Sequence, residues 1–549
     1  MTHIVVMKKR YLKILVFALV SQLVLTNACA QVDTTHKQTI EITSSYKPAL
    51  RDVVKINLYA TAIPADTSRP RLAYNIPAQN LFYLYQAVTL KPLALQSDTN
   101  LLLGSRNILK VGFGNFTTPY ISGAMSFGDG KKSLLNIYGD YISSKGKIVN
   151  QDFSELKLKG AGSLFNAGNE AYGSAEFAQH EHYQYGYDHS TLGFDKGIIR
   201  RSYQDFAVSA GYRNTDVNSV GVNYDPHFTF HSFNRQNKIG ENTFSFMLPA
   251  DKKFGDHVVM KVAFSGNVDA YQIKSSNQKI NNQLYQIAPE LIYYSDAFTF
   301  HGGITPSWNN KVVSILPNLY AELQLPQKLF LIQGGWVGRF INNSFRTLSN
   351  ENPFIEDPSF FYNTKEMQYY GGIKSTVGKH FTFNAKAAYI SYRDMPLFIN
   401  DQVIGNTFLV VNESKLDNFQ IHGDMNFISQ DKFTLTAGLD LNSYTGLKDN
   451  TQAWGLYPLK LQGSFRWNAF KQVLFKADLA AFSGAKALDH GNVKTLKGGT
   501  DISAGAEFKI NSKFSAWLDF DNILNSKYEK WNNYHVYGFQ AIGGVIIHF

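Results

Sequence analysis

The last thirteen residues, Tyr537-Gly-Phe-Gln-Ala-Ile-Gly-Gly-Val-Ile-Ile-His-Phe549, have the pattern of a single membrane-crossing strand. Every second position from Tyr537 to Phe549 is aromatic, aliphatic, Ala or Gly, whereas the positions between them are mixed and include Gln540 and His548. A transmembrane β-strand needs about 9–11 residues, whose side chains alternate between lipid and lumen. The segment therefore predicts the closing strand of a transmembrane β-barrel, with its odd-numbered residues facing lipid.

The N-terminal thirty residues have the form of a secretory signal peptide. Basic residues within 8–13 precede an apolar stretch at 14–25, which is too short for a helix to cross a hydrocarbon core of about 30 Å. Small residues at 28 and 30 have the spacing of a cleavage site, so we expect the mature chain to begin at Gln31. Cys29 is the single cysteine, and its removal would exclude disulfides, thiolate metal sites and cysteine nucleophiles. Acylation of Cys29, as in a lipoprotein, is the alternative.

The composition favours a membrane barrel over a soluble protein. Aromatic residues make up 14% of the chain and charged residues 17%, against about 25% charged in a typical globular protein. No long apolar run follows the expected signal, so any membrane crossing must be made by alternating strands. The Lys and Arg residues are scattered without a basic stripe, which argues against nucleic-acid binding. We expect the outer membrane of a Gram-negative bacterium, with lipid as the immediate neighbour.

Short polar turns recur along the chain, each leading into an alternating strand. Ten turns at an interval of about 42 residues fit two membrane strands plus one longer outer loop for each turn. Counted from Asn107, two strands for each turn and one at each end predict an all-β, antiparallel barrel of twenty-two strands, with eighteen or twenty as alternatives. A soluble β-sandwich is the competing interpretation. The predicted turns are at residues 128–132, 166–169, 214–216, 251–256, 295–297, 326–328, 377–379, 429–432, 468–471 and 511–513.

The alternation assigns a lipid face and a lumen face to several stretches. After residue 432, Leu435 and Leu439 belong to the apolar set, and Thr436 and Asp440 to the polar set. Residues 459–467 and 514–521 alternate in the same way. This assignment also places the carboxylates of Asp440, Asp478, Glu507 and Asp519 on the lumen side, where charge suits a wet pore lining.

The C-terminal region resembles the last barrel strands of TonB-dependent outer-membrane receptors. In that family an Asn-Leu-x-(Asn/Asp)-x-x-Tyr motif precedes the final strand, and here the matching residues are followed by a terminal aromatic. The resemblance implies a twenty-two-stranded barrel, uptake or passage of a solute, assembly by the barrel assembly machinery and coupling to a TonB-like protein. The residues that carry it are Asn522, Leu524, Asn525, Tyr528 and Phe549.

The N-terminal part departs from that family. Only 76 residues, 31–106, lie before the first expected strand, whereas the family has a plug of roughly 130 residues, so the plug is expected to be truncated or absent. A degenerate energy-coupling segment that pairs by strand addition is one interpretation of a short stretch near its start, and an ordinary amphipathic strand is the other. The expected domains are a signal peptide at 1–30, a plug-like or periplasmic segment at 31–106 and a barrel at 107–549. The candidate energy-coupling segment comprises Thr39, Ile40, Glu41, Ile42 and Thr43.

Candidates for chemistry are few. His180 and His182 would project from one face of a strand and could share a metal, with Asp188 or His189 arriving from a loop, but a belt of aromatic and histidine residues at the membrane interface or loop base is the favoured interpretation. No lipase, protease or nucleotide-binding motif is present, so we expect no enzymatic activity and no cofactor. The longest expected outer loop, 343–366, mixes aromatic and acidic residues. It suits either a ligand contact or a lid, and two functions stay open: a receptor or pore, and a non-transporting scaffold for a surface or envelope partner protein.

Overall fold

The computed structural model describes residues 107–325, 330–377, 380–429 and 432–549. The expected signal peptide and the segment 31–106, with its candidate coupling residues Thr39 to Thr43, lie outside the described residues. Two short helices occur in the described part, α2 (Lys196–Ile199) and α3 (Phe345–Glu351), and no helix there is long and apolar enough to cross a bilayer. Every other regular element in this part is a strand.

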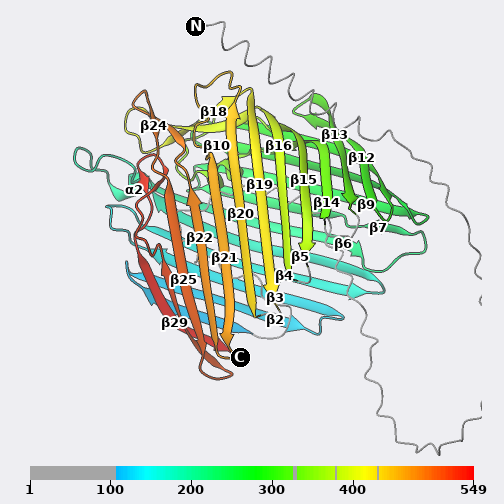
Figure 1. Cartoon of the computed structure of the whole chain (residues 1–549). Helices are drawn as coiled ribbons and strands as arrows, with labels where there is room; N and C mark the ends of the chain where they lie inside the picture. Colours follow the sequence, from blue (N-terminus) through cyan, green and yellow to red (C-terminus); the bar gives the residue numbers. More distant parts are fainter. Residues whose placement is uncertain (1–106, 326–329, 378–379, 430–431) are drawn as a thin grey trace, which may run out of the picture. The chain divides into compact units, whose positions relative to one another are not determined.

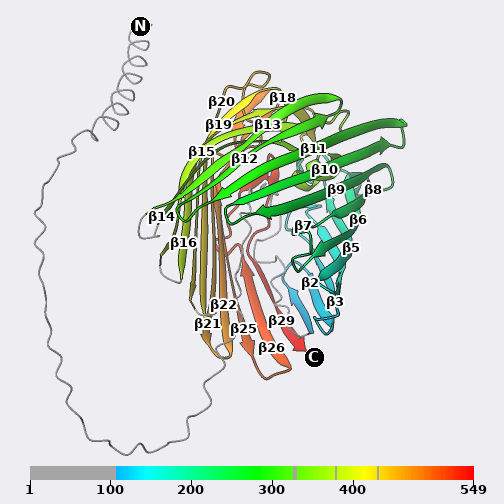
Figure 2. The same ribbon diagram turned by 90° about the vertical axis from the view of Figure 1, so that its right-hand side faces the viewer.

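Twenty-two of the strands form one closed antiparallel barrel, which confirms the predicted number (Figures 1 and 2). The short strand β7 (Val222–Tyr224) lies in the connection between β6 and β8 and pairs with β9. In order around the wall, the strands are β1 (Ile108–Gly114), β2 (Thr118–Gly128), β3 (Ser133–Ser144), β4 (Phe153–Asn166), β5 (Asn169–Tyr183), β6 (Arg200–Asn214), β8 (His227–Arg235), β9 (Ile239–Phe254), β10 (Val258–Ile273), β11 (Gln278–Tyr294), β12 (Phe298–Asn309), β13 (Val312–Gln324), β14 (Phe330–Ile341), β15 (Thr364–Val377), β16 (Phe381–Arg393), β19 (Leu416–Ser429), β20 (Phe433–Thr445), β21 (Leu459–Phe470), β22 (Val473–Phe482), β25 (Gly499–Lys509), β26 (Phe514–Asp521) and β29 (Gln540–His548).

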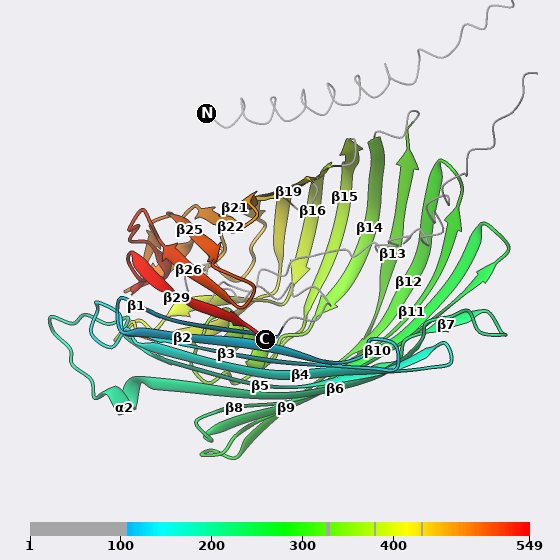
Figure 3. The same ribbon diagram turned by 90° about the horizontal axis from the view of Figure 1, so that it is seen from below.

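The barrel closes where the first strand meets the last. Strands β1 and β29 pair antiparallel from Ile108 opposite His548 to Gly114 opposite Ile542. Figure 3 shows the red strand β29 beside the blue strand β1. Closure leaves no sheet edge exposed to lipid, where an unpaired backbone group would cost several kcal/mol.

The ten predicted turns all join neighbouring wall strands at one end of the barrel. The turn at 326–328 lies outside the described residues, and those at 377–379 and 429–432 lie partly outside them, but the strands on either side of each turn pair with one another. In the turn between β4 and β5, Ala167 and Gly168 have φ values of 43° and 78°, the left-handed backbone that a two-residue hairpin requires. The longer connections lie at the other end.

The outer face of the wall is apolar, as the alternation predicts. Phe206, Val208, Phe228, Phe230 and Phe244 are each 40–45% exposed on neighbouring strands, which is too much apolar surface for a protein wall in contact with water. The barrel is therefore a transmembrane one. The predicted lumen carboxylates point the other way and are paired: Asp440 with His422, Asp478 with Arg466, Glu507 with Lys110, and Asp519 with Lys110 and Lys476.

The lipid-facing assignment of Tyr537 is wrong. This residue precedes β29 and is 6% exposed, and its hydroxyl donates to the carbonyl of Gln151 on the far side of the closing seam. The alternation holds from Phe539 onward, where Phe539, Val545 and Phe549 are exposed and Gln540, Ile542 and Ile546 are buried. Tyr537 fits the period only by coincidence, because it belongs to the connection before the strand.

An indole on the lumen side bridges the closing seam. Trp517 of β26 extends over Gly544 of β29 and donates from Nε1 to the carbonyl of Val111 in β1, at 3.2 Å. The ring needs Gly112 beneath it, because a Cβ there would lie 2.4 Å from the indole. Lys110 packs on the same ring, with its Nζ 3.9 Å from the centroid. Trp517 thus ties three consecutive strands together across the point of closure.

Replacing Leu439 by Arg should impair assembly far more than replacing Thr436 by Arg. The first change places a cation on the lipid face, at a cost of about 2–4 kcal/mol near the bilayer midplane, whereas the second places it in the lumen. The yield of folded, heat-modifiable barrel in the outer-membrane fraction measures the difference. Equal yields would contradict the assigned faces.

Replacing Trp517 by Ala should lower the temperature at which the folded band converts to the unfolded band in heat-modifiability gels. Loss of a buried indole costs about 3–5 kcal/mol, and here the loss falls at the seam. Trp308→Ala is the matched control, because Trp308 is 38% exposed on the outer face. Similar shifts for both variants would show that Trp517 has no special role in closure.

Candidate functional site

Three long connections fold together at the end of the barrel opposite the short turns. They are residues 342–363 with α3, residues 394–415 with β17 (Met395–Asn400) and β18 (Phe408–Glu413), and residues 522–539 with β27 (Glu529–Trp531) and β28 (Tyr534–His535). We refer to these three connections as the lid. A further pair, β23 (Lys486–Asp489) and β24 (Asn492–Thr495), lies in the connection between β22 and β25.

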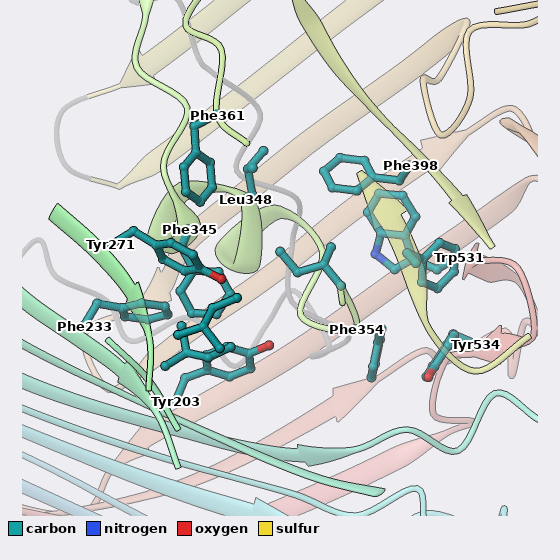
Figure 4. Close-up of a cluster of buried hydrophobic side chains, with 14 of the residues drawn as sticks. Tyr203, Phe233, Tyr271, Phe345, Leu348, Phe354, Phe361, Phe398, Trp531 and Tyr534 are labelled. Carbon is teal, nitrogen blue, oxygen red and sulfur yellow. The ribbon is translucent and has the colours of Figure 1, made fainter. Parts of the chain in front are cut away.

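The lid has its own aromatic core, which is continuous with the inner wall (Figure 4). Phe354 stacks on Tyr534 with ring centroids 3.6 Å apart, and Trp531 packs edge-on against Phe398 at 5.2 Å. Phe345 of α3 points toward the wall. The buried side chains that join it from the wall are Tyr203, Phe233, Ile239, Tyr271 and Ile273. Burial of this many rings makes the lid a packed element and not a set of loose loops.

The backbone also links the lid connections to one another. The amide of Phe408 donates to the carbonyl of Phe354 at 3.1 Å, and the amide of Glu356 donates to the carbonyl of Phe408 at 2.9 Å. These bonds accompany a parallel bridge between Ile355 and Phe408. The Tyr534 hydroxyl donates to the carbonyl of Asn406 at 2.6 Å. Each connection is thus held by the other two.

A wall carboxylate anchors the start of α3. Glu241 of β9 is 1% exposed and accepts hydrogen bonds from the backbone amides of Phe345 at 2.6 Å and Arg346 at 3.1 Å. Ser344 and Thr347 form a capping box at the same end. The first amides of a helix have no intrahelical partner, so a carboxylate there satisfies them.

The turn after α3 is fastened to the wall as well. The carbonyl of Pro353 accepts from the Tyr203 hydroxyl at 2.9 Å and from His182 Nε2 at 3.0 Å, and Asp357 forms an ion pair with Arg235. Where the connection rejoins β15, the side-chain amides of Asn282 and Asn363 exchange two hydrogen bonds, of 2.8 and 2.9 Å. Both residues are 1% exposed. Such a reciprocal amide pair holds the end of the connection against β11.

Beneath this lid lies a chamber of about 350 Å³. Its wall is the inward face of β4, β5, β6 and β8, and its roof is α3 and β27. Two histidine–carboxylate pairs of the wall lie within it: His180 with Glu155 across β4 and β5 at 3.5 Å, and His231 with Asp205 at 3.1 Å. A chamber that is polar inside and roofed by aromatic rings has the general character of a small-molecule site.

Glu351, at the edge of the chamber, is coupled electrostatically to two ammonium groups. Glu351 at the end of α3 interacts electrostatically with Lys460 of β21 and Lys530 of β27. Burial raises the pKa of the Glu351 carboxyl to about 7 and lowers the pKa of the Lys530 ammonium to about 7, and the opposite charges counteract both shifts. Glu351 therefore links two lid connections and the wall through one group.

The histidines predicted as metal ligands have separate surroundings. His180 and His182 do share the inward face of β5, as expected, but His180 pairs with Glu155 and His182 bonds to Pro353 of the lid. His189 bonds to the carbonyl of Tyr185, and Asp188 caps its own turn through Ser190 and Thr191. Within the described residues, no three potential ligands are grouped as a metal site would require.

The residues of the C-terminal motif lie where the lid joins the closing strands. Asn522 and Asn525 both have φ values near 48°, and their side chains bond to the backbone around them: Asn522 Nδ2 to the carbonyl of Tyr537 at 2.8 Å, and Asn525 Oδ1 from the amide of Phe539 at 3.1 Å. The Tyr528 hydroxyl donates to Asp501 at 2.9 Å. Leu524 is exposed, and the amide of Phe549 donates to the carbonyl of Asn107. The motif thus shapes the last lid connection.

Sequence reasoning missed the inward course of the connection 343–366. Its residues 364–366 belong to β15, and the remainder packs inside the mouth of the barrel. The signal was available in the repeated Phe of this stretch, because a loop that extends into water is not expected to carry so many large apolar side chains. Nothing in the sequence indicated that Glu351 and Lys530 would interact electrostatically, because the two residues lie far apart along the chain.

Comparisons with known proteins identify the fold. No protein family model and no curated protein matches this sequence. Solved structures do: the FrpB iron transporter from Neisseria meningitidis (F3-3 variant) has a TM-score of 0.62 at 10% identity, over 82% of each chain. The ferric enterobactin receptor PfeA from Pseudomonas aeruginosa has a TM-score of 0.61 at 9% identity, over 81% of each chain. The siderophore receptor PirA from Acinetobacter baumannii has a TM-score of 0.61 at 10% sequence identity, over 81% of this chain and 80% of that chain. The chain thus has the barrel fold of TonB-dependent outer-membrane receptors, as the C-terminal motif implied.

Replacing Glu351 by Gln should loosen the lid. The change removes the negative charge that offsets the repulsion between the Lys460 and Lys530 ammonium groups, at a cost of about 1–3 kcal/mol, and hydrogen exchange of residues 345–355 should become roughly tenfold faster or more. Adding Lys460→Met to Glu351→Gln should restore part of the protection, since it removes one of the two ammonium groups.

The control for this prediction is Glu356→Gln, which removes an exposed carboxylate from the same connection. Exchange detected by mass spectrometry in detergent-solubilised barrel reports all three variants. Equal exchange in the Glu351 and Glu356 variants would mean that the charge cluster does not hold the lid.

Proposed function

We propose that this chain is an outer-membrane receptor-type barrel that admits a solute at its outer mouth and passes it through the lumen toward the periplasm. The observation that carries the proposal is the ionisable chamber inside the barrel, closed by a lid whose polar contacts to the wall, beside its buried aromatic packing, are side-chain hydrogen bonds and an ion pair. Such contacts can exchange for water when the lid moves, which backbone pairing within the wall cannot do. Opening of the lid is therefore the gating step.

The barrel fold supports this proposal. The solved structures compared above are described as an iron transporter, a ferric enterobactin receptor and a siderophore receptor. The chamber is lined by carboxylates, ammonium groups and histidines together, so it suits a polar solute with more than one charged or hydrogen-bonding group. Non-enzymatic binding and release is the function that we infer for it.

Residues 31–106 complete the proposal. We infer that this segment serves as a shortened plug or a periplasmic docking element, and that Thr39 to Thr43 contact a TonB-like coupling protein. Assembly into the outer membrane would use the barrel assembly machinery, with Phe549 as part of the insertion signal.

A non-transporting scaffold is the second candidate, and the lid itself favours it. The aromatic core of the lid and its backbone links are what a permanent cap would have, and a permanent cap would present one fixed surface to a partner protein. The two candidates differ in one respect: the receptor needs the lid to move, and the scaffold does not.

A disulfide between the lid connections should separate them. The Thr407 hydroxyl donates to the Glu356 carboxylate at 2.7 Å across two lid connections, and the mature chain is expected to have no thiol of its own. In planar bilayers with KCl, the double variant Glu356→Cys with Thr407→Cys should show strongly reduced current when oxidised, and dithiothreitol should restore it.

Each single cysteine variant is a control and should not respond to dithiothreitol. Equal current from the oxidised and reduced double variant would show that the lid does not gate the pore and would favour the scaffold. A wild-type barrel that passes no current would favour the scaffold as well.

A further inference from the structure

The lipid face of the wall contains a groove of about 650 Å³ near the short-turn end of the barrel. It crosses strands β9 to β13 along one row of directly paired positions, in which Lys252 is opposite Met260, Met260 opposite Leu291, Leu291 opposite Gly302, and Gly302 opposite Leu319. Met260 is 54% and Leu291 44% exposed, so this row faces outward. The groove lies within the range of about 300–1,000 Å³ that is typical of small-molecule sites.

Two features of the sequence create the groove. Gly302 has no side chain in a row where its partners are large. Beside it, the pairing between β11 and β12 is interrupted: it runs from Tyr294 to Glu290 and resumes at Gln286, leaving residues 287–289 and 304–306 unpaired with one another. Pro289 and Pro306 fall in this gap, and proline has no N–H to donate to the ladder. The backbone ladder is therefore interrupted beside the groove.

The charge around the groove is one-sided on its outer face. Lys252 lies on the same face as Phe254, with its Nζ 5.6 Å from that ring, and only a few residues from the turn at 255–257. The acidic residues that line the groove are engaged elsewhere: Asp251 accepts from Asn223 at 2.9 Å, and Glu290 bonds to His301 at 2.6 Å. An ammonium group at this level meets the headgroups of the periplasmic leaflet.

We propose that this groove binds one glycerophospholipid of the periplasmic leaflet, with an acyl chain along Met260, Leu291 and Gly302 and its phosphate at Lys252. The apolar lining matches the acyl chain, and the ammonium matches the phosphate. The position at the short-turn end selects the leaflet, because the short turns of such barrels are periplasmic. This site is separate from the luminal chamber and does not depend on the proposed transport.

Native mass spectrometry of the full chain, purified in mild detergent and supplied with phosphatidylglycerol or phosphatidylethanolamine, tests the site. The wild-type barrel should retain one phospholipid. Gly302→Leu adds a side chain to the groove, displaces the Phe300 ring that lies 2.8 Å from the Gly302 Cβ position, and should reduce retention about tenfold. Gly160→Leu is the matched control, an outward-facing glycine of β4 with open space around its Cβ position, and it should retain lipid like the wild type.

Two further variants sharpen the test. Ala250→Leu fills the groove from β9, so it replaces Gly302→Leu if that variant gives no heat-modifiable barrel. Lys252→Gln should weaken retention of phosphatidylglycerol more than that of phosphatidylethanolamine, because only the second lipid carries a cation of its own. No retained lipid in the wild type, retention of lipopolysaccharide instead, or equal loss in Gly302→Leu and Gly160→Leu would each overturn the proposal.

Discussion

A bilayer offers no partner for backbone N–H and C=O groups, and this constraint governs the whole molecule. Every wall strand must pair on both sides, so the first and last strands must meet, although β1 comes at the start and β29 at the end of the described chain. Pairing alone fixes the seam in register, and the indole of Trp517 adds a side-chain link across it. A local gap in this pairing, between β11 and β12, occurs where prolines cannot complete the ladder.

The same constraint explains what the sequence reveals. Alternation is enforced wherever one face meets lipid, so the ten turns, the twenty-two strands and the faces of residues such as Leu441, Trp467 and Asp519 follow from the period alone. Tyr537 shows the limit, because a residue outside a strand can fit the period by chance. Periodicity carries no information about a connection, and it is the connections that form the lid.

The candidate site depends on contacts between segments far apart in the sequence. His180 and His182 were recognisable as neighbours on one face of a strand, but their partners Glu155 and Pro353 come from another strand and from the lid. Glu241, Glu351 and Lys530 were not recognisable at all. Each is a single charged residue whose role comes from the group it meets in the folded molecule, and no local pattern marks such a residue.

The interlocking of the lid has a consequence for the order of assembly. Trp531 and Tyr534 come from the connection just before the closing strand, yet they pack against Phe398 and Phe354 from much earlier connections. Contacts of such high sequence separation form late, since the intervening chain must first be brought together. The outer cap therefore cannot mature on a nascent wall. During biogenesis the mouth of the barrel therefore stays uncovered until almost the entire polypeptide has been exported and its strands have paired. A folded lid thus indicates that the barrel beneath it is complete.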